Sequence, residues 1–180
     1  MASHDAELLE AARQLLTRTE GQRGKLPSAR VRRSISTAYY ALFQFLLDEA
    51  ALKILGAGNG LRIRRRLFIR AITHSGMRLA IGKIQGQAIN ESLAPFFGSA
   101  EIAPRFARNL AKAFADAHGK RQSADYDLNE PLTESDARRL VARVQRVIEE
   151  WREAQSPEDR DFKHALAIVI LLKGKLRQEF

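Results

Sequence analysis

The stretch that decides the fold is Arg33-Ser34-Ile35-Ser36-Thr37-Ala38-Tyr39-Tyr40-Ala41-Leu42-Phe43. Apolar residues recur in and around it at steps of three and four, which is the spacing of one face of an α-helix. This apolar face runs from Val31 to Ala50, and Pro27 and the glycine-rich run 56–60 bound it. The spacing therefore predicts a long helix with a wide buried face.

The same spacing predicts further helices on both sides of this one. We expect a first helix over residues 4–19 and a third over residues 61–84. Glycine weakens a helix interior, so we expect the third helix to break or fray near Gly76. The segment 85–100 is rich in Gly, Pro and Asn and predicts an irregular connection.

Start signals mark three helices in the second half of the chain. Pro104 suits the first turn of a helix, which Gly119 is expected to loosen near its end. Thr133-Glu134-Ser135-Asp136 and Ser156-Pro157-Glu158-Asp159 both have the pattern of a capping box. The second box begins a closing helix that we expect to reach about Leu176.

The pattern as a whole is typical of an all-α protein. No period-two run bounded by turn residues indicates a strand, and short polar loops join the expected helices. These features predict an up-and-down antiparallel bundle of about five or six helices. The 180 residues contain no repeat or linker that would divide them, so we expect one domain over residues 1–180.

The composition limits the classes of function. The chain has no cysteine, which excludes thiol nucleophiles and thiolate metal sites and favours a reducing compartment. The N-terminus lacks the pattern of a signal peptide, and the longest apolar run, Ala165 to Leu172, is far shorter than the roughly 20 residues of a membrane-spanning helix. We expect a cytoplasmic protein with no membrane partner.

The charge balance is basic. Thirty Lys and Arg residues against twenty-one Asp and Glu residues give a formal net charge of +9. The excess is concentrated between Arg62 and Lys83, which makes a polyanion partner plausible. A solvated basic helix face explains the same residues equally well.

Signatures of common enzymes and metal sites are missing from the sequence. It has no phosphate-binding glycine loop, no zinc-protease motif and no nucleophile elbow. The four histidines, His4, His74, His118 and His164, lack a partner at metal-ligand spacing. We therefore expect neither a metal nor a cofactor.

Three motifs occur in an order that resembles the HEPN superfamily of helical proteins. They are the AYYALF part of residues 33–43, the stretch Arg70-Ala71-Ile72-Thr73-His74, and the stretch Arg121-Gln122-Ser123-Ala124-Asp125-Tyr126-Asp127. The tail from Phe162 to Arg177 is similar to the closing helix of a bacterial branch of that superfamily. The resemblance covers nearly the whole chain and implies a HEPN-like bundle that often dimerises.

The resemblance also implies that the first and last of these motifs pack against each other. Tyr39 and Tyr40 would bury their rings and need partners for their hydroxyl groups. We expect Arg33 to form an ion pair with Asp125 or Asp127, because a guanidinium group fits a carboxylate.

Ribonucleases of the superfamily carry an Arg followed four to six residues later by a His. Arg121 matches the Arg, but Tyr126 or Asp127 stands where the His is expected. Tyrosine titrates near pH 10 and is a poor general base at neutral pH, so enzymatic activity is uncertain. The candidate catalytic residues are Arg121, Tyr126 and His118, although His118 is also explained as a surface residue at a fraying helix end.

The basic stretch supplies candidate phosphate ligands. Arg64, Arg65, Arg66, Arg70 and His74 would bind RNA, with Arg70 and His74 one helical turn apart on a shared face. We favour a structural role for His74, by capping or packing beneath the AYYA helix, over this functional one. Phe96 and Phe97 are expected to fill the core rather than stack on bases.

The leading functional hypothesis is a homodimeric module that binds RNA or nucleotide. The resemblance also implies a component of a toxin–antitoxin or defence system, with a nucleotidyltransferase-like protein as cognate partner. A catalytically inactive protein–protein interaction module is the alternative. A metal-independent ribonuclease that uses Arg121 with a displaced histidine is the third possibility.

Overall fold

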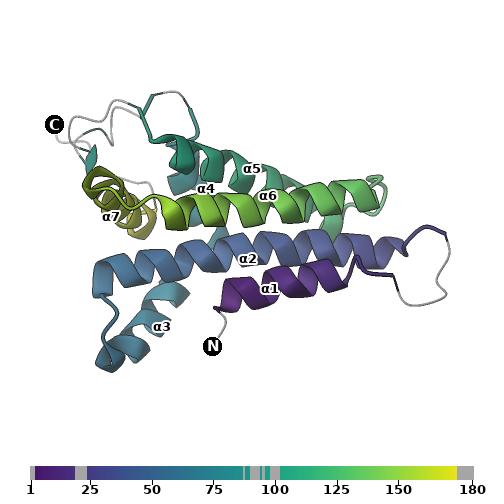
Figure 1. The fold of residues 1–180 in the computed structure, drawn as a ribbon, viewed down its shortest axis with the longest axis horizontal. Helices are drawn as coiled ribbons and strands as arrows, with labels where there is room; N and C mark the ends of the chain where they lie inside the picture. The colour runs from purple at the N-terminus through teal and green to yellow at the C-terminus, as the bar shows by residue number, and fades with distance from the viewer. Residues whose placement is uncertain are drawn as a thin grey trace. The chain divides into compact units, whose positions relative to one another are not determined.

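The computed structural model describes residues 3–18, 24–86, 88–89, 94, 96–97 and 102–173. These residues form helices and contain no strand, so the all-α prediction is confirmed (Figure 1). The elements are α1 (His4–Gln14), α2 (Ser28–Leu55), η1 (Asn59–Leu61), α3 (Arg62–Ala71), α4 (His74–Gly82), α5 (Arg105–Tyr126), α6 (Glu134–Glu153) and α7 (Pro157–Leu171). The described part thus has seven α-helices rather than five or six, because segment 61–84 forms two helices.

The chain forms two compact units. The first comprises residues 1–45 and 113–149, and the second comprises residues 46–112 and 150–180. Helices α2, α5 and α6 each contribute residues to both units. One domain over residues 1–180 stays a prediction.

The core of the first unit is built from α1 and from the parts of α2, α5 and α6 that belong to this unit. Helix α1 runs beside the first part of α2 (Figure 1), where the Ser34 hydroxyl group donates to the carbonyl of Ala12 at 2.8 Å. Small side chains permit this close approach. The fully buried side chains include Leu16, Ile35, Tyr39, Leu42, Phe114 and Leu140.

Helix α1 ends at Gln14, earlier than the expected residue 19. The Arg30 guanidinium from α2 donates to the Leu15 carbonyl at 3.0 Å, and Arg138 from α6 donates to the Leu16 carbonyl at 2.6 Å. The last carbonyls of a helix lack partners within the helix, and these arginines supply them. Tertiary contacts of this kind are invisible in the local spacing on which the boundary was predicted.

A buried lysine caps the C-terminal end of α6, in the second unit, by donating to backbone carbonyls there. Lys163 is only 3% exposed, and its ammonium group donates to the carbonyls of Trp151, at 2.6 Å, and Ala154. The Phe106 and Trp151 rings lie within 5.4 Å of the ammonium nitrogen. Burial lowers the pKa of Lys163 below its usual value, partly offset by Glu49, whose carboxylate accepts from Trp151 Nε1 at 2.8 Å.

The third expected helix is broken, as predicted, but the break lies at Ile72 and Thr73, three residues before Gly76. Ile72 is extended, with φ −98° and ψ 121°, and Thr73 caps α4 by accepting from the Gly76 backbone at 3.1 Å. Gly76 lies buried inside α4, where an added Cβ would come within 3.2 Å of the Lys173 side chain that follows α7. This glycine permits close approach, which is why its interpretation as a helix breaker was wrong.

Both predicted capping boxes are present. Thr133 Oγ1 accepts from the Asp136 backbone at 3.1 Å, and Asp136 Oδ2 accepts from the Thr133 backbone at 3.0 Å. Ser156 and Asp159 form the same reciprocal pair, with Pro157 in the first turn of α7. Helix α7 ends at Leu171, and residues 174–180 lie outside the described residues.

Several smaller predictions have definite outcomes. Phe97 is buried with its ring 4.7 Å from that of Phe162, which confirms that it fills the core. Most of segment 90–101 lies outside the described residues. Helix α5 continues through Gly119 to Tyr126, so the expected loosening is absent. None of the described helices combines the length and the apolar character that crossing a bilayer requires.

Candidate functional site

The first and last of the three motifs meet in the first unit, as the resemblance implies. The Arg121 guanidinium, on α5, donates from Nη2 to the Tyr40 hydroxyl group on α2 at 3.0 Å. One turn earlier on α2, the Ser36 hydroxyl group donates to Asp125 Oδ1. Ser36 and Tyr40 are four residues apart and therefore share a helix face. That spacing was the available signal for Ser36, whose bond to Asp125 the sequence analysis missed.

Arg121 lies among three tyrosine rings and one carboxylate. Its guanidinium carbon is 6.0, 5.6 and 5.1 Å from the ring centres of Tyr39, Tyr40 and Tyr126. Its Nε lies 2.7 Å from Asp125 Oδ2 without the alignment of a hydrogen bond, and Nη2 also donates to the Tyr126 hydroxyl group at 3.3 Å. We call Ser36, Tyr40, Arg121, Asp125 and Tyr126 the Arg121 cluster.

The electrostatics of the cluster favour a permanently charged arginine. Burial disfavours the charged form, but the hydrogen bond to Tyr40 and the nearby Tyr40, Asp125 and Tyr126 outweigh it, so the pKa of Arg121 is raised. The side chain is only 17% exposed, and Asp125 already balances its charge. A phosphate group would have to compete with Asp125 for this guanidinium.

Tyr39 is fully buried at the base of the cluster. Burial raises the pKa of its hydroxyl group well above the usual value, with Arg121 lowering it and Tyr40 raising it. A hydroxyl group with so high a pKa stays protonated at neutral pH. Tyr39 therefore acts as a packing surface and not as a base.

His118 also packs against Tyr39. Its ring meets the Tyr39 ring edge-on at 5.7 Å and lies stacked 6.5 Å from the Phe114 ring. It is half-buried in the middle of α5, so its interpretation as a surface residue at a fraying helix end is wrong. The three candidate catalytic residues, Arg121, Tyr126 and His118, thus belong to one unit, and Arg121 and His118 contact the same tyrosine ring.

The predicted ion pair of Arg33 is wrong. Asp125 pairs with Arg121, four residues before it on the same helix, and Arg33 is exposed. Asp127 Oδ1 accepts from the Asn129 backbone at 3.0 Å and so closes a turn. The residue that precedes Arg33 on α2 contacts the segment around Asp125 and Asp127 instead.

That neighbour is Arg32, which the sequence analysis missed. Its guanidinium donates to backbone carbonyls at the end of α5 and in the following turn, including those of Ser123, Asp127 and Glu130 at 2.9, 2.9 and 2.7 Å. A cation suits the C-terminal end of a helix, where carbonyls lack partners. Consecutive side chains of a helix point about 100° apart. Which of Arg32 and Arg33 faces α5 therefore depends on the rotation of α2 about its axis, which the motif alone does not determine.

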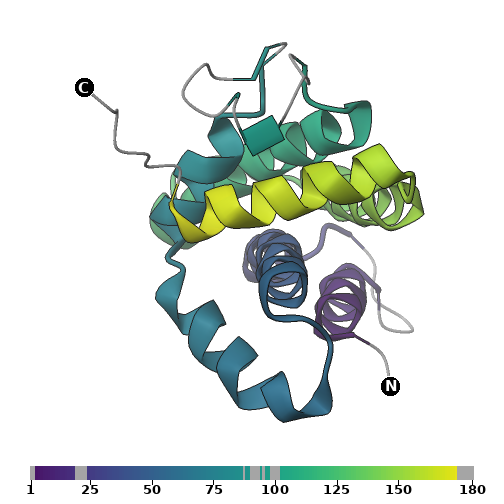
Figure 2. The ribbon, with the colours of Figure 1, turned by 90° about the vertical axis from the view of Figure 1, so that its left-hand side faces the viewer.

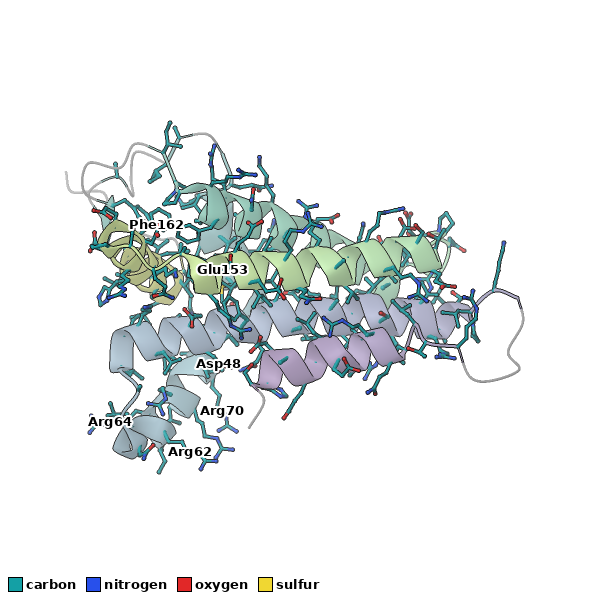
Figure 3. All side chains as sticks on the ribbon, viewed as in Figure 1. Asp48, Arg62, Arg64, Arg70, Glu153 and Phe162 are labelled. Carbon is teal, nitrogen blue, oxygen red and sulfur yellow. The ribbon has the colours of Figure 1, made fainter. Side chains whose placement is uncertain are left out.

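The candidate RNA ligands lie mainly on α3, in the second unit. This helix has no buried residue, and Arg62, Arg64 and Arg70 project from it (Figure 3). Arg66 is exposed as well, and none of the ion pairs among the described residues involves these four arginines. Their charges are available to a polyanion.

Arg65 and His74 differ from these arginines. Arg65 Nη1 donates to the carbonyls of Gly56 at 2.7 Å and Gly58 at 3.1 Å and so fixes the chain between α2 and α3. Figure 2 shows the backbone of this connection. His74 is the first residue of α4, beyond the break at Ile72, so it does not share a helix face with Arg70 as predicted.

The described residues contain no group of acidic or histidine side chains that could hold a metal ion. No family model, curated protein or solved structure matches this chain.

Proposed function

We propose that this chain is a HEPN-like helical-bundle protein that binds RNA through the exposed arginines of α3. The observation that carries the proposal is the set Arg62, Arg64, Arg66 and Arg70, exposed on one short helix without carboxylate partners among the described residues. Arginine forks recognise phosphate groups well, and each contact releases condensed cations from the RNA. The net charge of +9 adds a favourable long-range field.

The HEPN-like part of the proposal is supported by the Arg121 cluster. The hydrogen bond from Arg121 to Tyr40 and that from Ser36 to Asp125 join the two motifs on which the resemblance depends. On the same basis we propose a cytoplasmic component of a toxin–antitoxin or defence system, with a nucleotidyltransferase-like partner. Co-purification with a tagged protein of that class tests the pairing.

The geometry favours binding over cleavage. Asp125 balances the charge of Arg121, and the residue at the expected histidine position is Tyr126. General-base catalysis of this kind is most often carried out by histidine, which this position lacks.

Salt-dependent RNA binding tests the proposal. The logarithm of the association constant is measured against that of the salt concentration by fluorescence anisotropy, with a labelled single-stranded RNA. Replacing Arg64, Arg66 and Arg70 by Gln removes up to three phosphate contacts, and the slope should become shallower by about 2.

A charge-matched variant controls for the loss of net charge. Lys112, Arg146 and Arg160 are also exposed and form no ion pair among the described residues, so their replacement by Gln should leave the slope nearly unchanged. Equal changes in the two triple variants would show that the whole charge and not α3 attracts RNA. Binding that does not respond to salt would refute the polyanion proposal.

A further inference from the structure

The four most exposed large apolar side chains of the described residues occur in two pairs. Ile63 and Leu67, on α3, are 73% and 61% exposed, and Tyr126 and Leu128, at and after the end of α5, are 74% and 81% exposed. The next is Ile102 at 56%. Exposed apolar pairs of this kind mark surfaces that bind a partner more often than isolated side chains do.

The first pair is surrounded by positive charge. Ile63 and Leu67 are one turn apart on α3, and Arg66 and Arg70 form the adjacent row of the same helix. Arg65, Phe68 and Ile69 are half-buried and lie on the inward side. We call Arg62, Ile63, Arg64, Arg66, Leu67 and Arg70 the α3 face.

The second pair lies in a segment that contains two carboxylates. Residues 126–130, which we call the acidic turn, contain Asp127 and Glu130 and no basic residue. Arg32 binds the carbonyls of Asp127, Leu128 and Glu130, at 2.9, 3.2 and 2.7 Å, so the backbone of the turn is held in one conformation. A preordered surface loses less entropy on binding.

We propose that the α3 face of one copy of this chain docks on the acidic turn of a second copy. Ile63 and Leu67 pack on Tyr126 and Leu128, while the surrounding arginines meet Asp127 and Glu130. An apolar centre within a rim of opposite charges is the usual anatomy of a protein interface. We infer that each pair of copies makes this contact once and not reciprocally, which is a heterologous contact.

A second copy explains features that other occupants leave unmatched. RNA would engage the arginines but would gain little from Ile63 and Leu67. An anionic lipid surface would engage the whole α3 face but would leave the acidic turn without a partner. The proposal does not depend on RNA binding, because the acidic turn and the apolar pairs carry it.

Sedimentation velocity over a range of protein concentrations tests the contact without RNA. Leu67→Asn and Leu128→Asn each remove one large apolar group from the interface. Burying one such side chain corresponds to about tenfold or more in the association constant, so each variant should associate at least about tenfold more weakly than the wild type. High salt should weaken the wild-type association as well.

Mixing the two variants identifies the heterologous geometry. The Leu128→Asn chain keeps an intact α3 face and the Leu67→Asn chain keeps an intact acidic turn, so one complete contact remains possible between them. The mixture should therefore form a one-to-one heterodimer at concentrations where each variant alone is monomeric. An interface made of the same patch on both copies would not recover in this way.

Ile102→Asn provides a control, since Ile102 is exposed but belongs to neither surface. It should associate like the wild type, and circular dichroism should show all variants folded. The proposal is overturned by a wild-type chain that is monomeric at every concentration, by association that neither leucine variant weakens, or by a variant mixture that stays monomeric. A monomeric wild type that binds anionic vesicles through α3 would assign this face to lipid instead.

Discussion

Arg121 shows how one side chain joins two distant parts of the sequence. It donates to Tyr40 on α2 and to Tyr126 on its own helix, and it pairs with Asp125. The resemblance makes Arg121 a candidate catalytic residue. The observed contacts give it a structural role, which can be measured separately from any activity.

Replacing Arg121 by Lys should lower the free energy of unfolding by about 1–2 kcal/mol, because lysine keeps the charge but loses the planar fork that reaches both hydroxyl groups. Urea denaturation measures the change. Arg146→Lys, at an exposed site, should stay within about 0.5 kcal/mol of the wild type. Equal stability of the two variants would contradict a structural role for Arg121.

Which of the two neighbouring arginines, Arg32 or Arg33, makes a contact could not be predicted from the sequence. The motif correctly indicates that an arginine from this part of α2 reaches the segment around Asp127. Adjacent residues differ by about 100° in direction, and the sequence does not state which one faces α5. The structure assigns the contact to Arg32 and its backbone carbonyl partners.

At the scale of elements, the local sequence predicted where helices begin better than where they end. The boxes at Thr133 and Ser156 are made by neighbouring residues, so the sequence contains both partners. The end of α1 depends on Arg30 and Arg138, which come from other helices. The break before α4 was misplaced because Gly76 serves a close approach to Lys173 and not a turn.

Gly119 offers a test of helix continuity. It lies inside α5, and nothing lies within 4 Å of an added Cβ. Gly119→Ala should therefore raise the free energy of unfolding by up to about 1 kcal/mol, because alanine loses less backbone entropy in a helix.

Gly56→Ala is the matched comparison, since Gly56 has φ +81°, where a side chain causes strain. It should lower stability by about 1 kcal/mol or more. Denaturation of both variants measures the two changes. A destabilised Gly119→Ala chain would show that α5 is not a continuous helix at this position in solution.

At the scale of the whole molecule, the two proposals place two ligands on the α3 face. RNA phosphates and the acidic turn of a second copy would both engage Arg64, Arg66 and Arg70. At any one α3 face, occupation by one ligand then excludes the other, so RNA that saturates every α3 face leaves none for a second copy.

Adding excess single-stranded RNA should therefore shift self-associated protein toward monomeric complexes, as followed by sedimentation of labelled protein. The shift should be lost in the Arg64, Arg66 and Arg70 triple Gln variant, which binds neither ligand well. A Leu128→Asn chain should bind RNA at least as tightly as the wild type, because no copy competes for α3. Self-association that stays as strong when RNA saturates the protein would show that the two ligands use separate surfaces.

The arginines that close helix ends change how the basic composition should be understood. Four of these arginines donate hydrogen bonds to backbone carbonyls of the same molecule. They are Arg30, Arg32, Arg65 and Arg138. A guanidine-directed reagent such as phenylglyoxal should consequently modify the exposed Arg62, Arg64, Arg66 and Arg70 early, and the half-buried Arg30, Arg32 and Arg65 late. The order of labelling would distinguish arginines that bind backbone carbonyls of the same molecule from arginines that are available to a ligand.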